Sequence, residues 1–245
     1  MKLAECRYGL SVLVAGLFAG TSIACWSDGS VIDKVYHPYV EQLEWELEWR
    51  MVYQDENPVT GVERGQSHRL GLGHAFGEYF FAEAYLIGQR SSQESFELEA
   101  YEVEALWQLS EQGEFALDYG LLFELEKERN ADIWEYATVL LLEKEFNRFS
   151  ATANLGVIYE WGDDIENEWE TTLALQGRYR MSPRLEPALE MYMGENTLGA
   201  GPVLMGVERI GSAGANAFRW EAGVIFGLDS DTSDYTLRAL LEYEF

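Results

Sequence analysis

Basic residues are scarce in this chain, which has 17 Lys and Arg against 43 Asp and Glu and a formal net charge of −26 at pH 7. A protein that binds nucleic acid needs a basic surface to neutralise the phosphates, so this charge balance argues against a nucleic-acid partner. Histidine is rare as well, and His37, His68 and His74 are too scattered to make a dependable set of metal ligands. We predict neither a metal site nor a cofactor.

Long apolar runs are also missing from most of the chain. Beyond residue 24, no apolar stretch reaches the roughly 20 residues that a membrane-spanning helix needs. If this is a membrane protein, it must therefore be a closed β-barrel, in which the strands satisfy one another's backbone hydrogen bonds. Hydrophobic residues still make up 47 % of the chain, which excludes disorder.

The N-terminus has the features of a secretory signal peptide. Lys2 and Arg7 form a short basic region, the apolar run over 10–20 is too short to span a bilayer, and Ser22-Ile-Ala24 is a small-x-small cleavage site. The chain has two cysteines, and cleavage would leave Cys25 alone, either free or lipidated. We predict a signal peptide over 1–24, a short periplasmic leader over 25–38 and one β-barrel domain over 39–245.

The rest of the chain divides into segments of alternating hydrophobicity. In Leu43–Tyr53 the odd positions are apolar and Glu44, Glu46, Glu48 and Arg50 lie opposite them, a period of two that indicates a strand. Turns after odd-numbered segments tend to be longer and more acidic than those after even-numbered ones, as expected for an even-stranded barrel. We predict twelve strands, over 43–53, 68–76, 79–89, 96–109, 115–127, 134–145, 149–161, 169–181, 185–193, 198–209, 218–228 and 235–245.

Three places interrupt the alternation. Pro187 and Pro202 lack the N–H group that a strand ladder uses, so we predict a bulge or a strand end at each. Near Ala100–Tyr101 the apolar and polar positions exchange faces, which predicts a β-bulge.

The last eleven residues carry the clearest pattern, because every second residue from Tyr235 to the terminal Phe245 is apolar. A chain that ends on such a strand, with an aromatic residue last, resembles the outer-membrane β-barrels of Gram-negative bacteria, the porin-like superfamily. The resemblance implies an all-β fold, a single closed antiparallel up-and-down barrel of about 12 strands in the bacterial outer membrane. Lipid and lipopolysaccharide would surround it, and the barrel-assembly machinery would recognise its last strand. The assembly signal would comprise Tyr235, Leu237, Leu241, Tyr243 and Phe245.

If the apolar face points to lipid, the charged face lines the lumen. Acidic residues then gather on one wall, where we name Glu83, Glu102, Glu104, Asp118, Glu124 and Glu135. Basic residues gather on the other, where we name Arg178, Arg180, Arg219 and Arg238. This arrangement resembles the constriction of general porins, in which rings of charge set selectivity. We predict a narrow passive channel that favours cations or small neutral or cationic solutes.

Two other interpretations fit the same pattern. The charges could form a buried network that only satisfies itself, inside a closed structural or interaction barrel without transport. A soluble lipocalin-like or sandwich protein would show the same period with its apolar face inward. The excess of acid favours a wet lumen, since unpaired buried carboxylates are costly. It also separates this chain from the twelve-strand sugar-acid porins, which line their pores with basic residues.

Catalysis has little support in the sequence. Outer-membrane phospholipases use a Ser–His–Asn site, whereas Ser67 and His68 are neighbours in a strand and point to opposite faces. Acid pairs such as Glu102 and Glu104 suit a cation or acid–base chemistry, but they arise by composition in so acidic a chain. The acidic loops at 163–164 and 229–231 could bind divalent cations, although a solvated surface explains them as well. We predict no catalytic residues.

Overall fold

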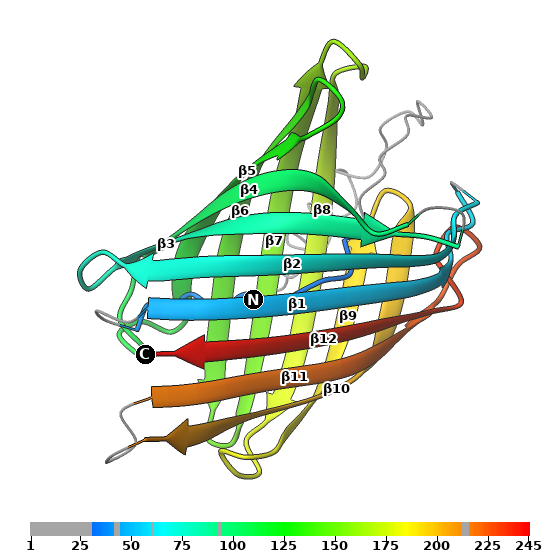
Figure 1. Ribbon diagram of the computed structural model, residues 1–245. Coiled ribbons are helices and arrows are strands. Elements are labelled where there is room, and N and C mark those ends of the chain that lie inside the picture. The colour runs from blue at the N-terminus through cyan, green and yellow to red at the C-terminus, as the bar shows by residue number, and fades with distance from the viewer. Residues whose placement is uncertain (1–30, 42–44, 60, 93–94, 212–215) are drawn as a thin grey trace, which may run out of the picture.

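The computed structural model describes residues 31–41, 45–59, 61–92, 95–211 and 216–245. In these ranges the chain forms twelve antiparallel strands, each paired with its neighbours in sequence, and β1 pairs with β12 to close the barrel (Figure 1). No helix in the described part of the chain could span a membrane. The strands are β1 (Trp45–Glu56), β2 (Glu63–Ala75), β3 (Phe80–Arg90), β4 (Glu97–Gln108), β5 (Asp118–Glu128), β6 (Ile133–Phe146), β7 (Phe149–Gly162), β8 (Glu168–Tyr179), β9 (Glu186–Gly194), β10 (Thr197–Ile210), β11 (Asn216–Gly227) and β12 (Tyr235–Glu244).

The prediction of one closed barrel with twelve strands is confirmed. The bounds agree to within three residues, with one exception at the first hairpin, where β2 begins at Glu63 instead of 68. Glu63 pairs there with Glu56 of β1. Both faces of this part of the hairpin are polar, so the alternation that marks a half-buried strand is absent from the sequence. The predicted signal peptide and Cys25 lie outside the described residues.

The two faces of the barrel are apolar outside and polar inside. Leu70 and Leu72 on β2 are each 49 % exposed, and Leu189 on β9 is 67 % exposed, whereas Arg238 and Glu143 on the opposite face are buried. A soluble protein would show the reverse arrangement. The soluble lipocalin-like alternative is therefore wrong, and the outer surface is suited to lipid.

Aromatic side chains gather on the outer face towards both ends of the barrel. At the end where β1 begins, Trp45 stacks on His74 with ring centroids 4.4 Å apart. At the opposite end, Trp161 stacks on Tyr159 and lies near Trp134. Amphipathic rings prefer the interface between hydrocarbon and water, so these clusters mark the two edges of an apolar belt.

The irregularities lie close to where the sequence predicts them. In the β3–β4 ladder Ile87 pairs with Ala100 and Gly88 pairs with Leu98, which leaves Glu99 as the extra residue of a bulge. Pro187 is the second residue of β9, so it lies at a strand end as predicted. Pro202 forms neither a bulge nor an end. The β10–β11 ladder is interrupted around it and resumes in the same register.

The C-terminal strand completes the barrel. The backbone of Phe245 exchanges hydrogen bonds of 2.9 and 3.0 Å with the backbone of Trp45, the first residue of β1. Leu241 and Phe245 are exposed on the outer face, while Arg238 and Glu242 between the outward residues point into the lumen. The predicted assembly signal thus faces outward as one surface, and its role in assembly stays a prediction.

Candidate functional site

The lumen contains a segment of the chain that precedes the barrel. We call residues 31–41 the leader segment. It begins against Gly194 at the end of β9, where the side chain of Val31 packs, and it ends with Glu41 beside Arg219 of β11 at the end of the barrel where β1 begins. We predicted a periplasmic leader over 25–38, but residues 31–38 of it run inside the barrel. A barrel of this width leaves more room than its own side chains fill, and the leader segment occupies that space.

Apolar contacts hold one side of the leader segment. Ile32 and Val35 are 1 % and 2 % exposed, and they pack with Tyr192, Val203 and Ile225 on the inner wall. These wall residues come from β9, β10 and β11, where the inward positions are less acidic than elsewhere. Burial of two aliphatic side chains contributes about 1.5–3 kcal/mol each.

Backbone groups of the leader segment pair with side chains of the wall. The amide side chain of Asn154 accepts a hydrogen bond from the Tyr36 N–H at 2.7 Å and donates one to the Tyr36 carbonyl at 2.9 Å. Further along, the Val40 N–H donates to Gln108 at 2.8 Å. Buried backbone groups need partners, and the wall supplies them as a neighbouring strand would.

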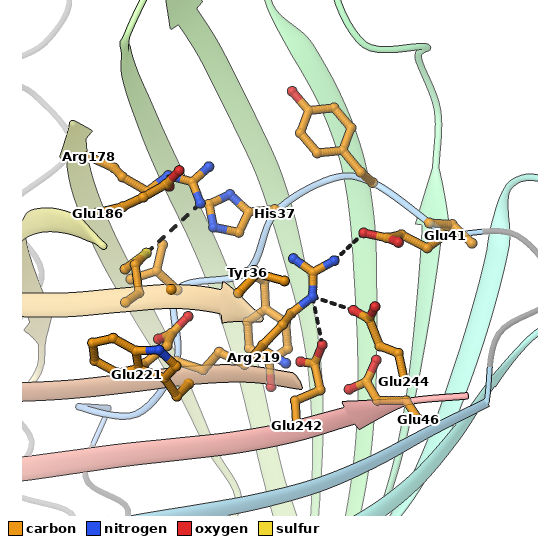
Figure 2. A pocket seen from close by; sticks show the side chains of 18 of the residues that line it. Tyr36, His37, Glu41, Glu46, Arg178, Glu186, Arg219, Glu221, Glu242 and Glu244 are labelled. Carbon is orange, nitrogen blue, oxygen red and sulfur yellow. Dashed lines mark hydrogen bonds and ion pairs between the residues drawn. The ribbon is translucent and has the colours of Figure 1, made fainter. Parts of the chain in front are cut away.

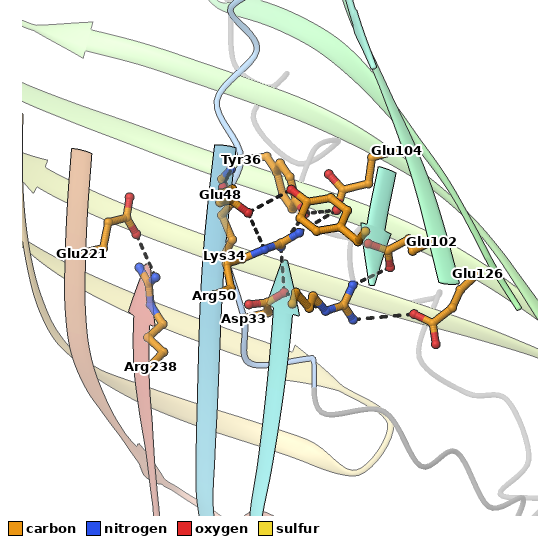
Figure 3. A network of polar contacts seen from close by, with 12 residues as sticks. Asp33, Lys34, Tyr36, Glu48, Arg50, Glu102, Glu104, Glu126, Glu221 and Arg238 are labelled. Carbon is orange, nitrogen blue, oxygen red and sulfur yellow. Dashed lines mark hydrogen bonds and ion pairs between the residues drawn. The ribbon is translucent and has the colours of Figure 1, made fainter. Parts of the chain in front are cut away.

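Arg50 of β1 is the centre of a charged network in the middle of the lumen (Figure 3). It is 2 % exposed and contacts the carboxylates of Asp33, Glu48 and Glu104 at 2.7 to 2.8 Å. The Tyr36 hydroxyl accepts from Arg50 at 2.8 Å and donates to Glu104 at 2.7 Å. Two leader residues and two strands therefore share one guanidinium, which joins the leader segment to the wall.

Lys34 of the leader segment occupies a cluster of three carboxylates. Glu46, Glu48 and Glu242 bring one oxygen each to within 4.8 Å of one another, and the Lys34 ammonium lies 2.5 Å from Glu48. Burial alone would lower the pKa of Lys34, but the charges of Glu48, Glu242 and Glu46 raise it well above its ordinary value. The leader segment thus provides the cation for this cluster.

The predicted acidic residues all belong to the lumen, and several already have partners. Glu83, Glu102, Glu104 and Asp118 are buried, while Glu124 and Glu135 are half-buried. Glu104 pairs with Arg50, Glu102 pairs with Arg69 of β2, and Asp118 accepts from the Tyr39 hydroxyl at 2.9 Å. Among the described residues, Glu83 and Glu124 make no ion pair.

The predicted basic residues also face the lumen, and each pairs with carboxylates. Arg238 contacts Glu190 at 2.5 Å and Glu221 at 2.8 Å. Arg219 contacts Glu41, Glu242 and Glu244. The remaining pairs are Arg178 with Glu143 and Glu186, and Arg180 with Glu143 and Glu145. Acid and base are thus interleaved on β11 and β12 instead of forming a purely basic wall.

A cavity of about 1080 Å³ lies between the leader segment and the end of the barrel where β1 begins (Figure 2). Its lining includes Tyr36, His37 and Tyr39 of the leader segment, Arg178 and Arg219 of the wall, and Glu46, Glu83, Glu186, Glu242 and Glu244. His37 lies 2.5 Å from Glu143. The cavity is large enough for a small solute, and its lining carries nine glutamates against six lysine and arginine side chains.

Sequence reasoning missed the leader segment as part of the site. Asp33, Lys34, Tyr36 and His37 each contact a wall residue, yet none lies in a segment of regular alternation. One signal was available. The stretch Val31-Ile-Asp-Lys-Val-Tyr-His-Pro-Tyr-Val40 mixes apolar, aromatic and charged residues of both signs, which suits a polar lumen better than water.

The histidines form no arrangement that resembles a hydrolase site. His68 lies near the rings of Trp49 and Phe96 on the outer face, and His74 stacks on Trp45. His37 pairs with Glu143 inside the lumen. The three therefore lie in separate places, and two of them face lipid.

No protein-family model and no curated protein sequence matches this chain. Solved structures do resemble it. The KdgM porin in complex with disordered oligogalacturonate has a TM-score of 0.53 and 13 % identity over 82 % of this chain and 98 % of that one. The NanC porin has a TM-score of 0.51 and 9 % identity, over 81 % and 98 %. An outer-membrane channel from Pseudomonas putida F1 has a TM-score of 0.55 and 11 % identity, over 90 % and 100 %.

At such low identity these likenesses establish the fold. The described chain has the same kind of fold as these porin and channel structures, a closed antiparallel β-barrel. The apolar outer face, with aromatic side chains towards both ends, suits a barrel that crosses a membrane.

Proposed function

We propose that the protein is a narrow channel whose acidic lumen favours small cations, or small neutral or cationic solutes. The observation that carries the proposal is the excess of inward carboxylates. Glu83 and Glu124 face the lumen without an ion pair among the described residues, whereas Arg50 and Arg238 already pair with other carboxylates. A pore with surplus negative charge attracts cations and repels anions. Surplus carboxylates also need water around them, which favours a wet lumen.

The leader segment narrows this pathway. Beyond the cavity of about 1080 Å³, Ile32, Arg50, Tyr85 and Tyr192 are each at most 2 % exposed, so the middle of the lumen is densely packed. The contacts that hold residues 31–41 to the inner wall are hydrogen bonds, ion pairs and the apolar contacts of Ile32, Val35, Tyr36 and Val40. Conduction at a useful rate would then need the leader segment to shift within the barrel.

The same packing favours a second function, a closed structural or interaction barrel without transport. In that case the ion pairs of Arg50 and Arg238 serve only to satisfy buried charges. The two functions differ in one property that can be measured, the passage of ions through the folded protein.

The test removes surplus charge from the lumen and leaves the ion pairs intact. We expect Glu83→Gln/Glu124→Gln to move the reversal potential in a salt gradient towards zero, because two unpaired carboxylates leave the lumen. Glu78→Gln/Glu166→Gln removes the same charge from exposed turns and is the matched control. An unchanged reversal potential in the lumen variant, or an equal change in the control, would refute the proposed origin of selectivity.

A further inference from the structure

A row of glutamates crosses the inner wall from the middle of the barrel to the end opposite the C-terminus. The strand register places Glu102 opposite Glu126, Glu126 opposite Glu135, Glu135 opposite Glu160 and Glu160 opposite Glu168. We call these five residues the acidic row. Directly opposite residues in an antiparallel pair have Cβ atoms about 4.5–5.5 Å apart, and like charges so placed destabilise the sheet. Five neighbouring strands therefore bring carboxylates together at an energetic cost.

Little positive charge reaches the acidic row. Arg69 pairs with Glu102 and lies 3.8 Å from Glu126. Within the described ranges, no ion pair reaches Glu135, Glu160 or Glu168. Glu102 is only 5 % exposed, and its Oε1 atom has no hydrogen-bond partner among the described residues. A buried carboxylate oxygen without a donor is costly, so the row lacks a component that would satisfy it.

The carboxylates of the row lie close enough to share a ligand. Glu102 and Glu126 are direct partners across neighbouring strands, and so are Glu135 and Glu160, so their side chains leave the inner wall side by side. At the mouth, Glu168, Glu170 and Glu195 bring one oxygen each to within 4.8 Å of one another. Two ligand oxygens on opposite sides of a Ca²⁺ ion are about 4.6–5.2 Å apart, so this spacing fits such an ion.

The carboxylate cluster around Lys34 shows how the same barrel satisfies a similar group. There, Glu46, Glu48 and Glu242 also bring one oxygen each to within 4.8 Å of one another, and the ammonium of Lys34 lies beside Glu48. The acidic row has no lysine of this kind within the described residues. A cation from solution would neutralise the carboxylates of the acidic row, as the Lys34 ammonium does in the other cluster.

We propose that the acidic row binds hard divalent cations, and that Ca²⁺ is the ion it fits best. Ca²⁺ accepts many oxygen ligands in irregular geometry, whereas Mg²⁺ demands a tight octahedron that carboxylates on separate strands do not provide. The site opens at the end of the barrel opposite the C-terminus. The proposal does not rest on conduction, because a closed barrel would bind the ion equally well.

The experiment uses the full mature protein, folded in detergent micelles, with Tb³⁺ as a luminescent substitute for Ca²⁺. Trp134, Trp161 and Trp169 are each adjacent in sequence to a residue of the row, so they can sensitise Tb³⁺ bound there. We expect sensitised emission that Ca²⁺ displaces and that K⁺ at equal ionic strength does not. Absence of emission, or equal displacement by K⁺, would overturn the proposal without any variant being needed.

Two matched variants locate the site. We expect Glu135→Gln/Glu160→Gln to weaken the apparent Ca²⁺ affinity by at least about tenfold, and Asp163→Asn/Asp231→Asn, in exposed loops, to change it by less than about twofold. If the loop variant loses binding and the row variant keeps it, the ion binds the outer loops and the proposal is wrong. Because direct binding is measured, neither result depends on whether the barrel conducts.

Discussion

Tyr36→Phe is the smallest change that tests how the leader segment is held in the lumen. The hydroxyl donates to Glu104 at 2.7 Å and accepts from Arg50 at 2.8 Å. Removing it leaves the ring, the backbone bonds to Asn154 and the direct Arg50–Glu104 contact of 2.8 Å in place. The variant therefore weakens the attachment of the leader segment with little effect on the wall.

The expected magnitude follows from the charge of the two partners. A hydrogen bond to a charged group contributes about 1.5–3 kcal/mol. Each 1.4 kcal/mol corresponds to about a tenfold change in an equilibrium constant. The undocked fraction of the leader segment should therefore rise about 10- to 100-fold in Tyr36→Phe, taking one such bond as the net loss.

Hydrogen exchange of backbone amides measures this fraction directly, because exchange from a protected segment reports its opening equilibrium. In the wild-type protein we expect the amides of Tyr36 and Val40 to be protected by their bonds to Asn154 and Gln108. In Tyr36→Phe they should exchange about 10- to 100-fold faster, while the strands keep their protection.

Tyr53→Phe is the matched control. Its hydroxyl lies on the outer face of β1 and reaches Asp55 at 3.4 Å, without contact to the leader segment. We expect no change in leader exchange in this variant. Unchanged exchange in Tyr36→Phe, or an equal change in both, would refute the reasoning that the Arg50 network holds the leader segment.

The remaining predictions concern pH, close packing and assembly. Burial would raise the pKa of Asp33, but three nearby arginines lower it below its ordinary value. The Asp33 carboxylate should therefore stabilise the docked leader segment above about pH 4, and this stabilisation should be lost as the pH falls through the lowered pKa. Exchange at about pH 5 should therefore still distinguish Asp33→Asn from wild type, and equal exchange there would contradict the sign. A Cβ at Gly201 would lie 1.8 Å from a backbone carbonyl oxygen of β11, whereas one at Gly177 meets nothing within 4 Å. Gly201→Ala should lower the unfolding temperature measured by heat-modifiable gel mobility, whereas Gly177→Ala should leave it unchanged. Equal unfolding temperatures in the two variants would contradict the close approach of β10 and β11 at Gly201. Phe245→Ala should reduce the amount of folded barrel in the membrane fraction of cells, while the purified chain should still refold in detergent. A wild-type amount of folded variant in the membrane fraction would contradict an assembly role for Phe245.

The barrel could be predicted because each strand has one apolar and one polar face. Leu43–Tyr53 and Tyr235–Phe245 reveal their faces by alternation alone, since lipid and lumen select opposite residue types at successive positions. The bulge next to Ala100 and the strand end at Pro187 followed from the same logic. At the tip of the first hairpin both faces are polar, and there the predicted start of β2 at 68 is five residues too late.

The site could be predicted only as a set of inward residues. The sequence shows that Glu104 and Arg238 face the lumen, but their partners depend on which strands lie across the barrel. We predicted that the leader lies in the periplasm, whereas residues 31–38 lie in the lumen. A segment inside a closed barrel has no periodic pattern that would reveal its position. The contacts of the leader segment join Asp33 to β1 and Tyr36 to β7, pairs far apart in the chain that no local pattern connects.

The surplus of carboxylates over basic side chains in the lumen is central to the proposed channel. The most direct measurement is the single-channel conductance of the mature protein in planar bilayers, with the reversal potential in a salt gradient. We expect a small conductance that selects cations. Anion selectivity, or no conductance from protein whose folding is confirmed by heat-modifiable mobility, would contradict it.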